Sequence, residues 1–81
     1  GPYDLSQSLG IPGQVGDRRV IDLMQSAVKT IRNAGKAAGT FANNTETAQG
    51  WIDAGVQYLG LGVDVGIFRK ACESLVKAVG R

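Results

Sequence analysis

The sequence predicts an α/β fold in which short parallel strands alternate with helices. Three stretches carry apolar residues at helical spacing, and two short, nearly uncharged stretches lie between them. Strands that alternate with helices along a chain pair in parallel through right-handed crossovers. Two parallel strands do not make an independent sheet, because such sheets need cover on both faces and neighbours on both edges. The 81 residues are therefore predicted to form a single partial domain, 1–81, of a larger sheet.

Residues 1–16 are predicted to be a loop with one short helical turn from Leu5 to Leu9. Gly1 and Pro2 open the segment as a rigid turn of small residues, and further glycines and a proline punctuate the rest. These punctuating residues are Gly10, Pro12, Gly13 and Gly16. The segment therefore has the composition of a surface loop.

A helix is predicted over 17–34. Asp17 is a good N-cap, and Gly35 is placed to end the helix in a left-handed conformation. Between them, apolar residues recur every three or four positions, which is typical of an amphipathic helix. These residues are Val20, Leu23, Met24, Ala27, Val28 and Ile31.

The second half of the chain is predicted to contain two strands and two helices. The small, almost uncharged stretch 36–42 and the stretch 57–63 have the character of strands buried on both faces. A helix is predicted over 45–54, after turn and capping residues, and another over 65–79, where apolar residues again fall at helical spacing. The order of these elements supports the parallel pairing.

Composition excludes several classes of function. The net charge of +2 is spread along the chain, so we expect no nucleic-acid binding. No apolar stretch reaches the roughly 18 residues of a membrane span and no signal peptide leads the chain, which predicts a cytoplasmic protein without membrane contact. The chain has no histidine, so no Ser-His or Cys-His couple can form within it.

The single cysteine, Cys72, is expected to be a buried thiol on the apolar face of the last helix.

Five stretches resemble one enzyme family in their order and spacing. They are Gly1-Pro2-Tyr3-Asp4-Leu5-Ser6, Leu9-Gly10 with Pro12 two places later, the Ala-Gly-Lys-Ala-Ala-Gly run at 34–39, the stretch 54–64, and the Gly-Ile-Phe-Arg run at 66–69. Together they resemble the HpcH/HpaI-type metal-dependent aldolases, the family of 4-hydroxy-2-oxoheptanedioate aldolase and 2-dehydro-3-deoxyglucarate aldolase. The resemblance implies that the chain is the C-terminal third of a (β/α)8 TIM barrel, which typically has about 250 residues, with two parallel strands and three helices.

The resemblance also implies a metal site and a substrate site. In such aldolases a divalent cation, Mg²⁺ or Mn²⁺, binds a 2-oxo acid such as pyruvate, and Asp4 matches one of its ligands. The backbone amides of Tyr3 and Asp4, on the turn made by Gly1 and Pro2, would receive the substrate carboxylate. Phe41 would line the aldehyde pocket, and Gly39 would keep that strand end open. The family's glutamate ligand, arginine and histidine belong to earlier strands, so no catalytic residue is assigned within this chain.

Alternatives remain at two positions and for the function as a whole. Asp4 and Asp64 could each be a helix N-cap, and Asp64 could instead contribute to the pocket. The residues after Phe41, Asn43 and Asn44, are more polar than in the family. The leading hypothesis is a carbon–carbon lyase that is inactive without the missing N-terminal part of the barrel. The alternatives are a noncatalytic folding or oligomerisation unit, and part of a related lyase or citrate-forming condensing enzyme.

The resemblance further implies a homo-oligomer. In relatives the last barrel helix packs against a neighbouring subunit in a swapped arrangement, and residues 65–79 would do the same here. We therefore expect the protein not to be monomeric.

Overall fold

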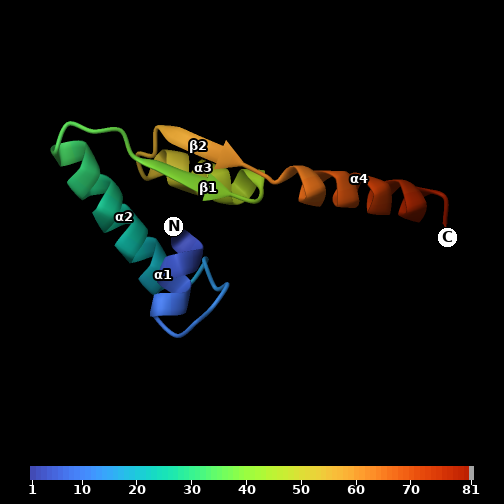
Figure 1. The fold of residues 1–81 in the computed structure, drawn as a ribbon, viewed down its shortest axis with the longest axis horizontal. Coiled ribbons are helices and arrows are strands. Elements are labelled where there is room, and N and C mark those ends of the chain that lie inside the picture. The colour runs from blue at the N-terminus through green and yellow to red at the C-terminus, as the bar shows by residue number, and fades with distance from the viewer. Residues whose placement is uncertain (81) are drawn as a thin grey trace.

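The computed structural model describes residues 1–80, which form four helices and a two-stranded parallel sheet (Figure 1). In chain order the elements are α1 (Pro2–Ser8), α2 (Arg18–Asn33), β1 (Gly39–Ala42), α3 (Thr45–Asp53), β2 (Tyr58–Leu61) and α4 (Asp64–Ala78). The predicted α/β class is therefore confirmed.

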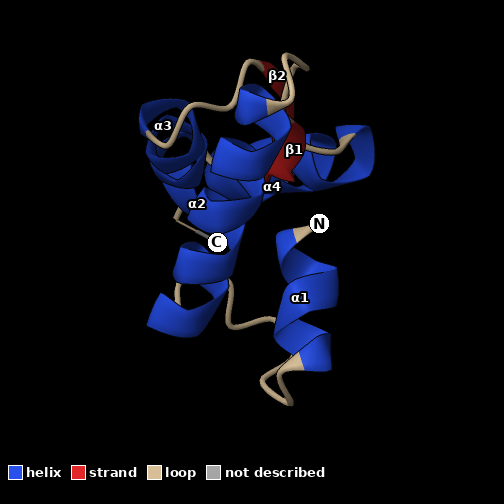
Figure 2. Ribbon diagram, turned by 90° about the vertical axis from the view of Figure 1, so that its left-hand side faces the viewer, coloured by secondary structure: helices blue, strands red, loops and turns tan. Residues whose placement is uncertain are grey.

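The sheet and α3 form a β-α-β unit. β1 pairs with β2 in parallel, from Gly39 opposite Tyr58 to Ala42 opposite Leu61. The connecting helix α3 lies against one face of the sheet, and Figure 2 shows it beside the strands with α1 below them. Both strands are shorter than the predicted stretches 36–42 and 57–63, because only four residues of each stretch pair with the other strand.

The other face of the sheet has no covering helix within residues 1–80. Gly39, Phe41, Tyr58 and Gly60 share this face, since paired residues of neighbouring strands point the same way. The side chain of Tyr58 is 77% exposed there. A parallel sheet requires cover on both faces, so this open face is the one that further strands of the barrel would enclose.

A small apolar core joins α2, α3 and the face of the sheet that α3 covers. Its members are Val20, Met24, Val28, Ala38, Ala42, Ala48, Trp51 and Val56. α2 begins after Asp17, whose carboxylate accepts hydrogen bonds from the backbone N–H of Arg19 at 2.9 Å and from its Nε at 3.1 Å. The side-chain hydrogen bond from Arg19 is the main reason that the pKa of the Asp17 carboxyl lies below its ordinary value. At the other end of the helix, Arg32 donates to the carbonyl oxygen of Gly55 at 3.1 Å and ties α2 to the turn before β2.

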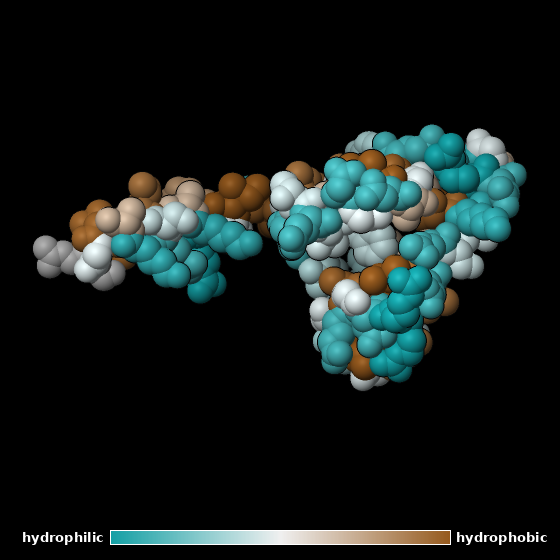
Figure 3. Space-filling view, turned by 180° about the vertical axis from the view of Figure 1, so that it is seen from behind, coloured by the Kyte–Doolittle hydropathy of each residue, from teal (hydrophilic) through white to brown (hydrophobic). Residues whose placement is uncertain are grey.

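α4 projects from the rest of the molecule (Figure 1). With this helix included, the structure measures 51 × 28 × 18 Å along its principal axes. No residue of α4 is buried. Apolar side chains cover one side of the projecting arm and polar side chains cover the other (Figure 3). Cys72, which the sequence places in a buried apolar face, is exposed, because that face of α4 contacts nothing within residues 1–80.

The opening segment differs most from the prediction. Residues 1–16 were expected to be a loop with a turn at Leu5 to Leu9, and the structure has a seven-residue helix, α1, that starts at Pro2. Within residues 1–80, no helix combines the length and apolar character that crossing a bilayer demands.

Candidate active site at the carboxyl end of the strands

The first turn of α1 presents the carboxylate of Asp4. Gly1 is the N-cap of this helix, and Pro2 occupies its first turn, where the missing proline N–H costs no hydrogen bond. Asp4 also lies in the first turn, so it is not the N-cap, which was the structural alternative for this residue. Its side chain is exposed and bends back over Gly1, where a Cβ would lie only 2.7 Å from Oδ2. A glycine at position 1 therefore leaves room for this carboxylate.

The same turn offers backbone donors. The N–H groups of a first helical turn have no partner within the helix, and here those of Tyr3 and Asp4 are in that position. Such N–H groups are suited to bind a carboxylate or another anion. The role of the two amides in receiving a substrate carboxylate stays a prediction.

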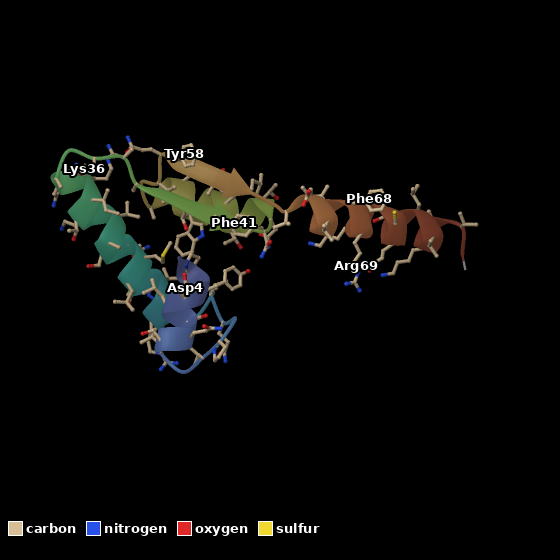
Figure 4. The ribbon with its side chains drawn as sticks, in the orientation of Figure 1. Asp4, Lys36, Phe41, Tyr58, Phe68 and Arg69 are labelled. Atoms are coloured by element: carbon tan, nitrogen blue, oxygen red, sulfur yellow. The ribbon has the colours of Figure 1, made fainter. Side chains whose placement is uncertain are left out.

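A hydrogen bond connects this turn to the end of β1. Asn43, the residue after the strand, donates from Nδ2 to the hydroxyl oxygen of Tyr3 at 2.6 Å. The bond links residues 40 positions apart in the sequence. Figure 4 shows Asp4 on α1 and Phe41 on β1 in this region. The fold thus brings the opening motif to the carboxyl end of the sheet, where barrel enzymes have their active sites.

Ser6 fixes the shape of the motif from within. Its side chain is fully buried, donates from Oγ to the carbonyl oxygen of Tyr3 at 2.6 Å, and accepts a hydrogen bond from the backbone N–H of Gly13 at 3.0 Å. These two bonds hold α1 to the loop that follows it. Sequence reasoning used Ser6 only as part of the motif, and its anchoring function depends on a loop contact that local patterns do not reveal.

Replacing Ser6 with alanine is expected to lower the free energy of unfolding of the full-length protein by about 1–3 kcal/mol, because the Gly13 N–H would lose its partner. Urea unfolding measures this as a lower midpoint at unchanged slope. Ser8→Ala is the matched control, since Ser8 is an exposed serine of the same helix. An equal midpoint for Ser6→Ala and Ser8→Ala would contradict the anchoring role.

Known aldolases resemble this chain in sequence and in fold. The chain is 36% identical over 75 residues to a hydroxypyruvate/pyruvate aldolase of Paraburkholderia phytofirmans, and covers 28% of that protein. It is 39% identical over 74 residues to a 2-keto-3-deoxy-L-rhamnonate aldolase of Salmonella paratyphi B, again covering 28% of it. The structure superposes on the crystal structure of an HpcH/HpaI aldolase from Desulfitobacterium hafniense with a TM-score of 0.85 and 29% identity. The chain belongs to the HpcH/HpaI aldolase family.

The chain corresponds to only a part of the length of the aldolases that it matches. It spans a little over a quarter of the length of the curated relatives, whereas those matches include 93% and 91% of this chain. The structural match includes 98% of this chain and 31% of the Desulfitobacterium protein, so the superposition extends into the projecting α4. The predicted partial TIM barrel is confirmed by this superposition. No family model matches the chain.

The residues present fit a divalent metal in part. Asp4 offers an exposed carboxylate near the carboxyl end of β1, and oxygen is the ligand type that Mg²⁺ and Mn²⁺ prefer. Residues 1–80 contain no group of three acidic, cysteine or histidine side chains that could hold a metal. A hard cation takes about six oxygen ligands, so Asp4 can supply only one corner of such a site.

The remaining predicted site residues on the sheet lie at different positions along β1. Phe41 is near the carboxyl end of β1 on the open face, with Gly60 opposite it. Gly39 begins β1 at the other end, where a Cβ would lie 3.2 Å from the carbonyl oxygen of Tyr58. Gly39 therefore permits close strand packing and is not brought beside Asp4.

Asp64 starts α4 directly after β2. The N-cap of α4 is Val63, and the Asp64 carboxylate accepts a hydrogen bond from the N–H of Val65 at 2.8 Å. Asp64 is thus a first-turn residue and not the N-cap that was one of its two interpretations. Its side chain is exposed at the carboxyl end of the sheet, and the pocket role stays a prediction.

Proposed function

We propose that the chain is the C-terminal part of a divalent-metal-dependent carbon–carbon lyase that cleaves 2-oxo-4-hydroxy acids to pyruvate and an aldehyde. The observation that carries the proposal is the position of Asp4. Its carboxylate is exposed, and the preceding residue, Tyr3, is hydrogen-bonded to Asn43 directly after β1. Mg²⁺ or Mn²⁺ is the proposed cofactor. When bound, such an ion supplies Lewis-acid stabilisation of the negative charge that develops on the keto oxygen.

The reaction requires one proton to leave and another to return. A base takes the proton of the 4-hydroxyl group, the bond between C3 and C4 breaks, and its electron pair forms the enolate of pyruvate while C4 becomes the aldehyde carbon. The enolate then takes up a proton at C3 to give pyruvate. No residue of this chain is assigned as the base, which we place, with the glutamate and arginine that the family resemblance implies, outside residues 1–81.

Within this chain the proposed tasks are binding and orientation. The N–H groups of Tyr3 and Asp4 receive the substrate carboxylate, and Asp4 binds the metal. Phe41 lines the aldehyde side and, as a bulky apolar residue, narrows it and keeps water away. Gly1 and Pro2 shape the turn that presents these groups.

The chain alone is proposed to be inactive, and its proposed partners are the missing N-terminal part of the barrel and a second copy of the protein. Two surfaces support this proposal: the open face of the sheet and the apolar side of α4. A cytoplasmic location is part of the same proposal. The alternative of a noncatalytic folding or oligomerisation unit is favoured by the same two surfaces.

The proposal is tested with the full-length protein that contains these residues. Expected is release of pyruvate from a 4-hydroxy-2-oxo acid, measured with lactate dehydrogenase, that EDTA abolishes and Mn²⁺ restores. Absence of turnover with added Mg²⁺ or Mn²⁺ would support the noncatalytic alternative. Formation of citrate from oxaloacetate and acetyl-CoA, without pyruvate release, would support the condensing enzyme.

A further inference from the structure

A single hydrogen bond ties the opening turn to the sheet. Among the hydrogen bonds formed within residues 1–80, the bond from Asn43 Nδ2 to the Tyr3 hydroxyl oxygen at 2.6 Å is the one that joins residues 1–16 to the β-α-β unit. Leu5 and Leu9 also pack against the core, but apolar packing is non-directional. The orientation of the first turn therefore depends on this bond and on the bonds that Tyr3 makes within the opening segment.

Tyr3 is held at two places. Its hydroxyl oxygen accepts from Asn43, and its carbonyl oxygen accepts from the buried Oγ of Ser6 at 2.6 Å. The peptide bond between Tyr3 and Asp4 is planar and trans, so the N–H of Asp4 points away from the carbonyl group that Ser6 binds. Fixing both the ring and the carbonyl group of Tyr3 therefore fixes the direction of the Asp4 N–H and the point from which the Asp4 side chain extends.

Asn43 itself lies in a rigid part of the fold, the short connection between β1 and α3. The residue before it, Ala42, is buried, and its carbonyl oxygen accepts from the N–H of Gly62 at 2.9 Å. The residue after it, Asn44, caps α3 by accepting from the N–H of Thr47 at 2.8 Å. Because both of its neighbours are fixed, the Asn43 amide can hold another group in place.

We propose that Asn43 and Tyr3 are positioning residues, and that the hydrogen bond between their side chains holds Asp4 and the two first-turn N–H groups at a fixed place beside the strand end. This inference rests on the proposed lyase function. Misplacement of a reacting group by about 1 Å can lower a rate by about 100-fold. The bond therefore affects turnover through the orientation of the turn, and neither side chain contacts the reacting atoms.

The test is a double-mutant cycle in the full-length protein, with Tyr3→Phe, Asn43→Ala and both combined. Each single substitution removes one partner of the bond, and we expect it to lower kcat for pyruvate release with Mn²⁺ by about tenfold, with a smaller change in KM. The double variant should lose no more than either single variant, because both substitutions remove the same bond. The midpoint of urea unfolding should change little, since the bond is exposed.

Asn33→Ala is the matched control, because Asn33 is an exposed asparagine at the end of α2 that leads to the start of β1. Additive losses in the double variant, a fall in the urea midpoint in place of a fall in kcat, or an equal loss in Asn33→Ala would overturn the inference. If the wild-type protein releases no pyruvate, the lyase function fails, and calorimetric titration with Mn²⁺ decides separately. Weaker Mn²⁺ binding to both single variants than to wild type would then support the positioning of Asp4, and equal or absent binding would overturn it.

Discussion

Replacing Asp4 with asparagine is expected to lower the metal-dependent turnover of the full-length protein by about 100-fold or more. Asparagine has nearly the same size, but it lacks the negative charge that a hard divalent cation prefers. A bound cation contributes several kcal/mol of charge stabilisation in the transition state, and each 1.36 kcal/mol corresponds to about a tenfold change in rate. Because Asp4 is exposed and forms no cap, the substitution should leave the folded structure intact.

The decisive measurement is a Mn²⁺ titration of the Asp4→Asn protein together with its rate of pyruvate release. The apparent Mn²⁺ affinity should fall in parallel with the rate, and excess Mn²⁺ should restore only part of the activity. Asp53→Asn is the control, since Asp53 is an exposed acid at the end of α3 that accepts a hydrogen bond from Gln49 at 2.9 Å. Wild-type Mn²⁺ affinity in Asp4→Asn would show that this carboxylate is no ligand.

The helices were predictable because their signals are local. The apolar spacing over 17–34 predicted a helix, and α2 covers Arg18–Asn33 with Asp17 as its N-cap, as expected. α1 was underestimated, since Gly1 and Pro2 have the composition of a turn. Proline fits the first turn of a helix as well as it fits a loop, so composition alone could not locate the start of α1.

The site was predictable only as a set of separate residues. Resemblance to the family nominated Asp4 and Phe41, but neither the bond between Tyr3 and Asn43 nor the bonds of Ser6 follow from any local pattern. The bond between Tyr3 and Asn43 depends on the path of 40 residues through the rest of α1, α2 and β1. Long-range contacts of this kind require the fold, and they bring the opening motif to the end of a strand.

The apolar stripe of α4 is clear in the sequence pattern, but no surface within residues 1–80 covers it. A helix turns by about 100° per residue, so its apolar residues at these spacings form one stripe. The stripe consists of Val65, Phe68, Cys72, Leu75, Val76 and Val79. Phe68 is 73% exposed, and it points to the opposite side from Arg69 in Figure 4. An exposed stripe of this kind is typical of an interface, and we propose a second copy of the protein as its partner.

Replacing Phe68 with aspartate is therefore expected to convert the full-length protein from an oligomer to a monomer. Burial of a phenylalanine side chain contributes about 1.5–3 kcal/mol, and a buried unpaired carboxylate adds a further cost. Each 1.4 kcal/mol weakens association about tenfold, so the combined effect should exceed 100-fold for each contact. Light scattering at micromolar concentration measures the mass directly.

Ser74→Asp provides the matched control for this prediction. Ser74 is an exposed residue of α4 that lies outside the apolar stripe, and the substitution adds the same single negative charge. It should leave the oligomer intact, because a charge on the solvated side of the helix has no buried partner to disrupt. A monomeric wild-type protein, or equal dissociation by both variants, would contradict assembly through the stripe. If Phe68→Asp is monomeric yet still binds Mn²⁺, then the metal site forms within one subunit.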